Sequence, residues 1–375
     1  MRPQLIVVPV AVLMMLLALV AGVFRLLALQ GMVAQPPLVT VFPFHGEVMV
    51  FGFLAVLITT ERYLGSLAFK LNPVVHGMPF LVALGAVLKV VGELAGVDLM
   101  NTVGSILLAV GIAIYIYLLL AVSRQSAQPL PFRFMVLAAL FLLMGDLFSL
   151  RGSPVGNINF TLFLLGFPIL TILGERVELS RFLAPAVYRR GEWGLWAALM
   201  AFLLLLVQDG RLLVALWAVL MALATLPLMG SELALVRVGQ TSPQKLHRYL
   251  GQHLLLAYSW FFLGLVLVIV WAAVRGGSAL YDASVHSLAV GFVGTMILAH
   301  APVIAPAILP RTIAQEKLNL LPLVLLTAGN LLRVGGYILK GAGLPLGGVV
   351  GVSGLFILAA LVAFAWVMAR SLRPA

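Results

Sequence analysis

Six histidines are the side chains in this 375-residue sequence best suited to binding a metal ion. The chain has no cysteine, so any metal must be held by His, Met, Asp, Glu or Tyr, and disulfides and iron–sulfur clusters are excluded. His45, His253, His286 and His300 lie inside long apolar segments. An imidazole in hydrocarbon needs a partner, because an unsatisfied polar group there costs several kcal/mol. Each of these four histidines is therefore a candidate site residue.

The composition excludes soluble protein folds. Hydrophobic residues make up 63% of the chain and charged residues 9%, and the mean hydropathy is +1.16. A soluble domain has roughly a quarter of its residues charged, so we expect an integral membrane protein surrounded by the lipid bilayer. The net charge of +11 does not indicate nucleic-acid binding, because the Lys and Arg residues lie in loops between apolar segments rather than on one basic surface.

Twelve apolar segments predict an all-α, polytopic helical bundle with about 12 transmembrane helices. Most are roughly 17 residues or longer, which is enough to cross a bilayer, and residues 1–375 are expected to form a single transmembrane domain. The joints at 96–101 and 208–211 imply tight hairpins and leave the number of spans open by one pair. The segments are about 4–29, 41–60, 76–96, 101–122, 131–150, 158–174, 193–208, 211–230, 249–274, 281–309, 318–338 and 344–369.

The basic residues predict the orientation of the chain. An even number of spans places both termini on one side of the membrane, and about 16 Lys and Arg residues lie at the termini and in the loops of that side. Basic loops stay in the cytoplasm, so both termini are expected there, in a bacterial inner membrane. The first span lacks a small-residue cleavage site and is expected to be retained. The opposite loops hold about four basic residues, which are Arg151, Arg211, Arg275 and Lys340.

This orientation sorts the histidines by depth. His45 and His286 each lie about one turn below the outer end of a span, so they share an outer level. His300 follows His286 by 14 residues, which in an α-helix places it about 21 Å deeper and within about 40° of the same face. His253 shares that inner level. His76 and His247, at loop edges, are expected to be interfacial polar residues.

Paired imidazoles from separate helices are the usual way in which a membrane bundle holds haem b. We therefore predict a bis-histidine haem b site at His45 and His286. The inner pair, His253 and His300, is expected to form a second iron site or a proton-handling position, and an interhelical hydrogen bond is the alternative for any one histidine. Gly52, two turns from His45, suits either the edge of a macrocycle or close helix packing.

Charged residues inside the spans are further candidates. Arg25 lies near the outer level, where it could neutralise haem propionates or extend toward the headgroups. Lys89 and Arg333 are also intramembrane cations, which are costly enough to indicate function. Carboxylates at span ends, such as Glu61 and Glu93, suit either proton entry or a plain interfacial role.

Five stretches of the chain resemble the NnrS-like proteins, a family of polytopic haem- and copper-containing membrane proteins linked to nitric oxide and denitrification. Their order and spacing cover most of the chain, so the set is more specific than any single motif. The second-span stretch also resembles a haem-holding helix of haem–copper oxidase subunit I. The stretches are FHGEVMVFGFLAVLITTERYLG, ILGERVELSRFL, HLLLAYSWFFLGLVL, VHSLAVGFVGTMILA and GNLLRVGG.

The resemblance implies a haem-holding bundle in which His45, His253 and His286 match the histidines of the family. Where the family motif has a second histidine in this span, the chain has Glu47. A carboxylate is a poor ligand for Cu(I), so a copper site would have to recruit another residue such as His300, and copper binding stays open. The chain also lacks the paired-histidine helix of the oxidases, which disfavours oxygen reduction.

Two classes of function follow from these observations. The first is a haem protein of nitric-oxide or nitrogen-oxide metabolism, acting as an electron carrier, a sensor or a protective redox protein, with nitric oxide as a ligand and a redox protein as donor. The second is a twelve-helix secondary transporter without haem, in which the Gly/Pro-rich stretch 299–310 would be a broken helix. Neither the catalytic residues nor an enzymatic reaction can be assigned.

The orientation can be tested with a reporter that is active only in the cytoplasm, fused after Ala375. We expect an active reporter, because the excess of basic residues on that side is about fourfold. A silent reporter on an intact, membrane-inserted chain would reverse the topology, and the pair His45 and His286 would then lie on the cytoplasmic side.

Overall fold

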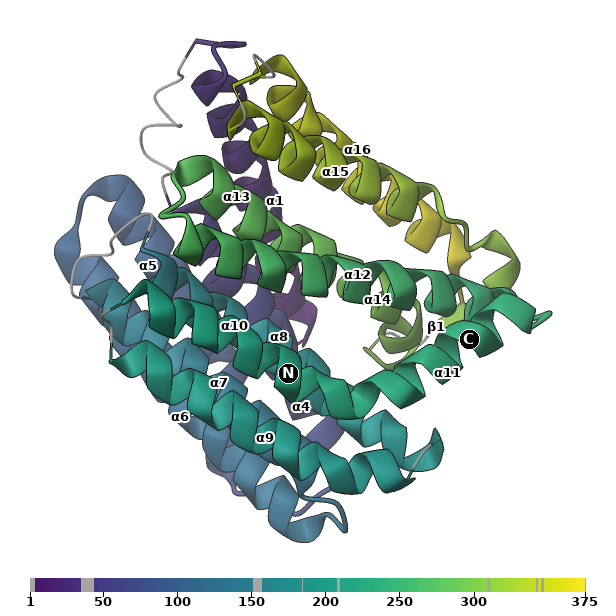
Figure 1. The fold of residues 1–375 in the computed structure, drawn as a ribbon. Helices are drawn as coiled ribbons and strands as arrows, with labels where there is room; N and C mark the ends of the chain where they lie inside the picture. Colours follow the sequence, from purple (N-terminus) through teal and green to yellow (C-terminus); the bar gives the residue numbers. More distant parts are fainter. Residues whose placement is uncertain are drawn as a thin grey trace. The chain divides into compact units, whose positions relative to one another are not determined.

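Helices make up almost all of the computed structural model (Figure 1). The structure describes residues 4–34, 44–150, 157–183, 185–207, 210–308, 311–341, 343–344 and 347–374. Their contacts divide the chain into two compact units: residues 1–25 and 35–179 form the first, and residues 26–34 and 180–375 form the second.

The first unit contains most of α1 and α8 and all of the elements between them. The helix α1 continues into the second unit for its last four residues, and so does α8. The elements are α1 (Gln4–Leu29), α3 (His45–Glu47), the π-helix η1 (Val48–Ala55), α4 (Val56–Ser66), the short 3-10 helix η2 (Pro73–Gly77), α5 (Met78–Ala95), α6 (Asp98–Gln125), α7 (Leu130–Leu150) and α8 (Ile158–Leu183).

The second unit contains the remaining helices and two short strands, and its last two helices, α15 and α16, lie side by side (Figure 1). The elements are α9 (Pro185–Leu206), α10 (Arg211–Thr225), η3 (Leu226–Leu228), α11 (Met229–Thr241), α12 (Lys245–Ala273), α13 (Ser278–His286), the π-helix η4 (Ser287–Gly294), α14 (Thr295–Ile308), β1 (Arg311–Ile313), η5 (Gln315–Lys317), α15 (Leu321–Gly341), α16 (Gly347–Ser371) and β2 (Leu372–Pro374).

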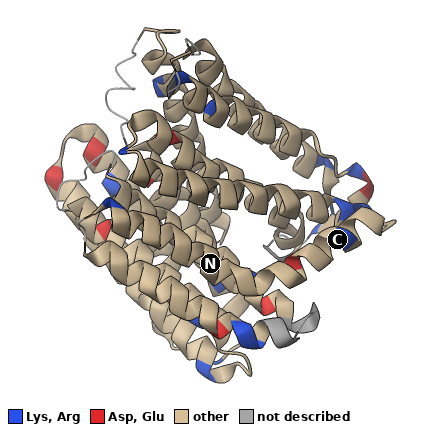
Figure 2. Cartoon of the chain, viewed as in Figure 1, with Lys and Arg blue, Asp and Glu red and all other residues tan. Residues whose placement is uncertain are grey.

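The prediction of an all-α polytopic bundle is confirmed. Within the described residues, 11 helices are long and apolar enough to cross a membrane, and α9, at the predicted segment 193–208, is a further long helix. The charged residues lie mainly near helix ends (Figure 2). The chain is therefore a multi-pass membrane protein.

Some helices extend beyond the apolar segments that predict them. The helix α8 continues to Leu183, past the predicted end at 174, and α10, η3 and α11 form one run to Thr241, past 230. Charged residues end an apolar span, but Glu, Arg and Leu are good helix formers and continue the helix itself. Hydropathy therefore located the spans better than the helix ends.

The expectation of a broken helix at 299–310 is wrong for its described part. The helix α14 runs unbroken through Pro302 and Pro306 to Ile308, while Leu309 and Pro310 lie outside the described residues. Proline is tolerated in membrane helices, where neighbouring groups satisfy the freed backbone carbonyls. This stretch therefore gives the transporter hypothesis no support.

A two-stranded sheet that the sequence did not predict joins the segment after α14 to the C-terminal end. The strands β1 and β2 are antiparallel, with Thr312 opposite Arg373. The amide of Ala314 extends the pairing by donating to the carbonyl of Ser371 at 2.8 Å. The pairing holds both segments at one end of the second unit. Two helices, α15 and α16, lie between the strands, and two successive spans return the chain to the side from which it started.

The helices α5 and α6 of the first unit pack closely and are joined by a tight turn. Gly96 ends α5 in the left-handed conformation, with φ of 65°, so the hairpin expected at 96–101 is present. Gly85 lies where the two backbones meet, and a Cβ atom added there would come within 2.6 Å of the backbone nitrogen of Leu108. Small residues of this kind allow close helix contact in membranes.

Replacing Gly85 with Ala is expected to lower the free energy of unfolding by about 1–3 kcal/mol, the usual range for overpacking, because the new methyl group meets backbone that cannot move aside. Thermal unfolding of the purified chain in lipid nanodiscs measures this loss. Gly65→Ala is the matched control, since nothing lies within 4 Å of its added Cβ. Equal stability of the two variants would contradict the packing.

Candidate functional site

Two π-helical segments accompany the histidines that were predicted to hold haem. One, η1, begins three residues after His45, and the other, η4, begins directly after His286. The first lies in the first unit and the second in the second unit. π-Helical turns are rare and are often found at functional sites. The sequence carries no signal for them, because an apolar run does not distinguish α-helical from π-helical turns.

The segment η4 also changes one prediction. The alignment of His286 with His300 on one helical face assumes an α-helix between them, but eight of the intervening residues are π-helical. A π-helix has i→i+5 hydrogen bonds and a wider turn, so the angle of about 40° expected between the two side chains does not hold.

His45 packs against α1 in the first unit. A Cβ atom added at Gly22 would lie 3.2 Å from Cδ2 of the His45 ring, so the imidazole lies on that glycine. Arg25 follows Gly22 by three residues, which places it one turn further on the same face of α1. Gly52 packs on Met14 of α1, and a Cβ atom added at Gly52 would lie 3.0 Å from Met14 Cβ. This contact supports close helix packing, rather than the edge of a macrocycle, as the role of Gly52.

His286, in the second unit, is oriented by the residue one turn before it. Its Nδ1 lies 2.9 Å from the carbonyl oxygen of Asp282 and 3.1 Å from Oδ1 of the same residue. Both neighbours accept hydrogen bonds, so Nδ1 carries a proton. Arg333 donates to the Asp282 carboxylate through Nε at 2.7 Å and Nη2 at 2.9 Å. The intramembrane cation Arg333 therefore belongs to this arrangement.

His253 and His300 lie on the adjacent helices α12 and α14, close enough to interact electrostatically. Each donates its Nδ1 proton to the carbonyl four residues earlier at 2.7 Å, to Tyr249 and Met296 respectively. The Tyr249 hydroxyl donates to the carbonyl of Leu298 at 2.9 Å, which ties α12 to α14. His253 is fully buried, and among the described residues its Nε2 has no hydrogen-bond partner.

The structure thus brings His253 and His300 together within the second unit. His45 belongs to the first unit and His286 to the second, so their pairing stays a prediction. His76 and His247 have local partners, the Tyr63 hydroxyl at 2.8 Å and the Ser242 hydroxyl at 3.0 Å. In the described part of the chain, no three His, Asp or Glu side chains converge as they would around a metal ion.

A buried ionic cluster lies in the first unit, around the intramembrane cation Lys89. Its ammonium group donates to Asp146 Oδ1 at 2.7 Å, Ser105 Oγ at 2.7 Å and Ser149 Oγ at 3.2 Å. Ser149 in turn donates to Oε2 of Glu47 at 2.9 Å. An ammonium has three protons, so Lys89 is fully satisfied as a cation. Asp146 is a carboxylate inside an apolar span, a signal that the sequence analysis did not use.

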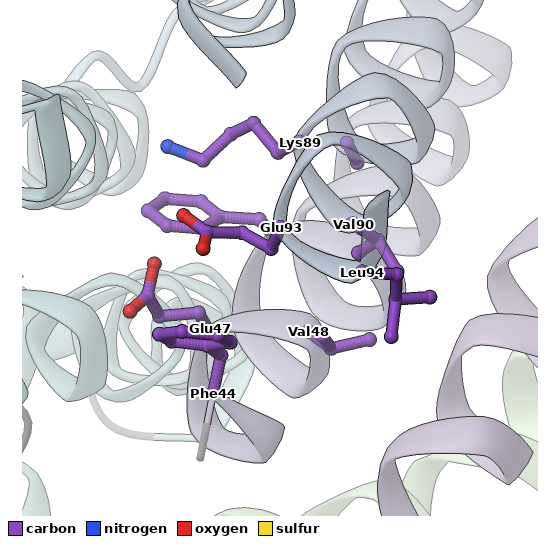
Figure 3. Close-up of a pocket in the computed structure, with 9 residues that line it drawn as sticks. Phe44, Glu47, Val48, Lys89, Val90, Glu93 and Leu94 are labelled. Carbon is purple, nitrogen blue, oxygen red and sulfur yellow. The ribbon is translucent and has the colours of Figure 1, made fainter. Parts of the chain in front are cut away.

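The ionic cluster borders a small pocket. In Figure 3 the side chains of Glu47, Lys89 and Glu93 extend toward the same side of this pocket, whose other walls are apolar. The ammonium of Lys89 lies 4.9 Å from the ring centre of Phe51, and Glu93 accepts a hydrogen bond from Asn101 at 2.5 Å. Glu47, which replaces the second histidine of the resembled motif, is linked to Lys89 through the Ser149 hydroxyl and therefore belongs to the hydrogen-bond network of this cluster.

Replacing Lys89 with Met should lower the free energy of unfolding by roughly 3–5 kcal/mol, because it leaves the fully buried Asp146 carboxylate without its cation. The double variant Lys89→Met/Asp146→Leu should regain most of this loss. Unfolding of the single and double variants in nanodiscs gives the coupling free energy. Additive losses in the double variant would show that the two residues do not act as a pair.

Comparison with known proteins gives a family but no relative of known activity. The model of the family described as "Domain of unknown function (DUF8744)" matches residues 5–369, from the first apolar span to the last. No curated protein matches the chain. Because the match covers nearly the whole sequence, the chain belongs to this family of domains of unknown function.

Proposed function

We propose that the protein is a haem-binding integral membrane protein of nitric-oxide or nitrogen-oxide metabolism. The observation that carries the proposal is how three intramembrane imidazoles are hydrogen-bonded. His253, His286 and His300 each have Nδ1 hydrogen-bonded to a carbonyl one turn earlier. Such a bond fixes the tautomer and leaves Nε2 as the ligand atom, as in most histidine-bound metal sites.

The residues present fit a haem group. The buried Nε2 of His253 has no hydrogen-bond partner in the described part of the chain, and binding to a haem iron would satisfy it. The carboxylate of Asp282 next to His286 would raise the basicity of that ligand. In the outer site, His45 and His286 would hold the iron, and Arg25, one turn from the contact of His45 with α1, would pair with propionates.

When bound, haem supplies an iron that changes oxidation state and binds small diatomic ligands. The residues of the chain hold the ring nitrogens in one tautomer, keep water out through apolar neighbours and place Arg25 near the outer level. These tasks suit an electron carrier, a sensor or a protective redox protein, with nitric oxide as the ligand and a redox protein as the electron donor.

The finer localisation is part of the same proposal. We place the chain in a bacterial inner membrane with both termini in the cytoplasm, on the strength of the basic residues in its loops. The outer pair of histidines would then face periplasmic donors. The alternative is a secondary transporter without haem, and a purified chain without a haem spectrum would favour it.

Replacing His45 or His286 with Ala should each remove the low-spin spectrum of the outer haem, because a bis-imidazole iron needs both ligands. Visible absorption spectra of the purified variants measure this loss. His247→Ala is the matched control, since that histidine is exposed and bonded to Ser242. Full haem occupancy with an unchanged spectrum in both variants would overturn the outer site.

A further inference from the structure

A second ionic cluster lies at the opposite end of the second span from His45, in the first unit. Arg62, near the end of α4, forms an ion pair with Glu175 of α8. Its guanidinium also lies 3.7 Å from an oxygen of Glu178 and 4.0 Å from Oε1 of Glu61. These four residues are called the Arg62 cluster below. Three carboxylates thus surround one guanidinium.

The Arg62 cluster faces a buried hydroxyl that has no partner. Tyr115 of α6 is fully buried, and no hydrogen bond to its hydroxyl exists among the described residues. This hydroxyl lies within electrostatic range of Arg62, Glu61 and Glu175. The Nε atom of Arg62 is also buried without a hydrogen-bond partner. Near the Arg62 cluster, two buried polar atoms of the described residues therefore have unused hydrogen-bonding capacity.

The charges of the Arg62 cluster do not balance. Arg176 follows Glu175 in α8 and is buried as well. Even with its charge included, the three carboxylates outnumber by one the two guanidinium groups that are described around them. An uncompensated charge in a low-dielectric environment costs several kcal/mol, and a carboxylate avoids this cost by taking up a proton. The described residues offer no three-ligand arrangement for a metal ion here.

The distances indicate which carboxylate takes the proton. Glu175 contacts the guanidinium directly and stays ionised as its partner. The Glu178 side chain is the most exposed of the three, at 36% compared with 23% for Glu61 and 16% for Glu175, so water supports its charge. Glu61 is the carboxylate farthest from Arg62, at 4.0 Å, and it is less exposed than Glu178. Its charge therefore has neither a direct contact with the guanidinium nor as much support from water, so Glu61 takes the proton.

We propose that the Arg62 cluster is a proton-binding site. A proton from the aqueous phase at this end of the span adds to the Glu61 carboxylate and converts it to a carboxylic acid. Tyr115 supplies the hydrogen-bond partner on the buried side. The site is separate from the proposed haem ligands, and the basic loops predict that it faces the cytoplasm.

Infrared spectroscopy of the wild-type chain in lipid nanodiscs tests the site without any cofactor, through pH-difference spectra in the carbonyl region of protonated carboxyl groups. We expect one protonated carboxyl near neutral pH that is lost in Glu61→Gln and kept in Glu192→Gln, whose carboxylate is exposed. A band that persists unchanged in Glu61→Gln would overturn the proposal.

A milder variant covers the case in which Glu61→Gln does not fold. Tyr115→Phe keeps every carboxylate and the shape of the ring, and it should shift the frequency of the carboxyl band by removing one hydrogen bond. An unshifted band would overturn the role of Tyr115. The spectra should not depend on sodium concentration at fixed pH, and displacement of the proton by sodium would show a metal-cation site instead.

Discussion

The absence of water from the membrane interior is the constraint on which the rest of this structure depends. A polar group buried in hydrocarbon must find its partner inside the chain. Lys89 donates a hydrogen bond to Asp146, and Arg333 donates two hydrogen bonds to Asp282. Hydroxyl groups follow the same rule by donating to the carbonyl one turn earlier, as Thr59 does to Ala55 at 2.7 Å. The ion pairs connect separate helices, whereas the hydroxyl bonds lie within one helix.

Two of the exceptions to this rule lie at the proposed sites. The Nε2 atom of His253 and the hydroxyl of Tyr115 are buried without a hydrogen-bond partner in the described part of the chain. Binding to a haem iron would satisfy the first group, and a protonated Glu61 would satisfy the second.

Much of the fold could be predicted from the sequence, because hydropathy and length report directly on whether a helix can cross a bilayer. The tight turn at Gly96 was predictable in the same way. The π-helical segments were not, since they arise from packing rather than from a local pattern. The predicted angle of about 40° between His286 and His300 was therefore wrong. The electrostatic interaction between His253 and His300 agrees with the prediction that they lie at the same depth.

The candidate sites were predictable by residue type but not by partner. Lys89 and Arg333 stood out because cations are costly inside a span, yet their carboxylates come from helices far away in sequence. Asp146 and Asp282 are acidic residues in apolar segments, and this property alone marks them as candidate partners of the two cations. Contacts between distant spans depend on how helices rotate about their axes, which a single sequence does not specify.

The central claim is that the intramembrane imidazoles of this chain hold haem. Its most direct measurement is the content of haem and iron in the purified wild-type protein. The account predicts protohaem in every preparation, with about two irons per chain if His253 and His300 bind a second group and about one if only the outer pair does. A folded, membrane-inserted chain that contains neither haem nor iron after expression with ample haem supply would contradict the account.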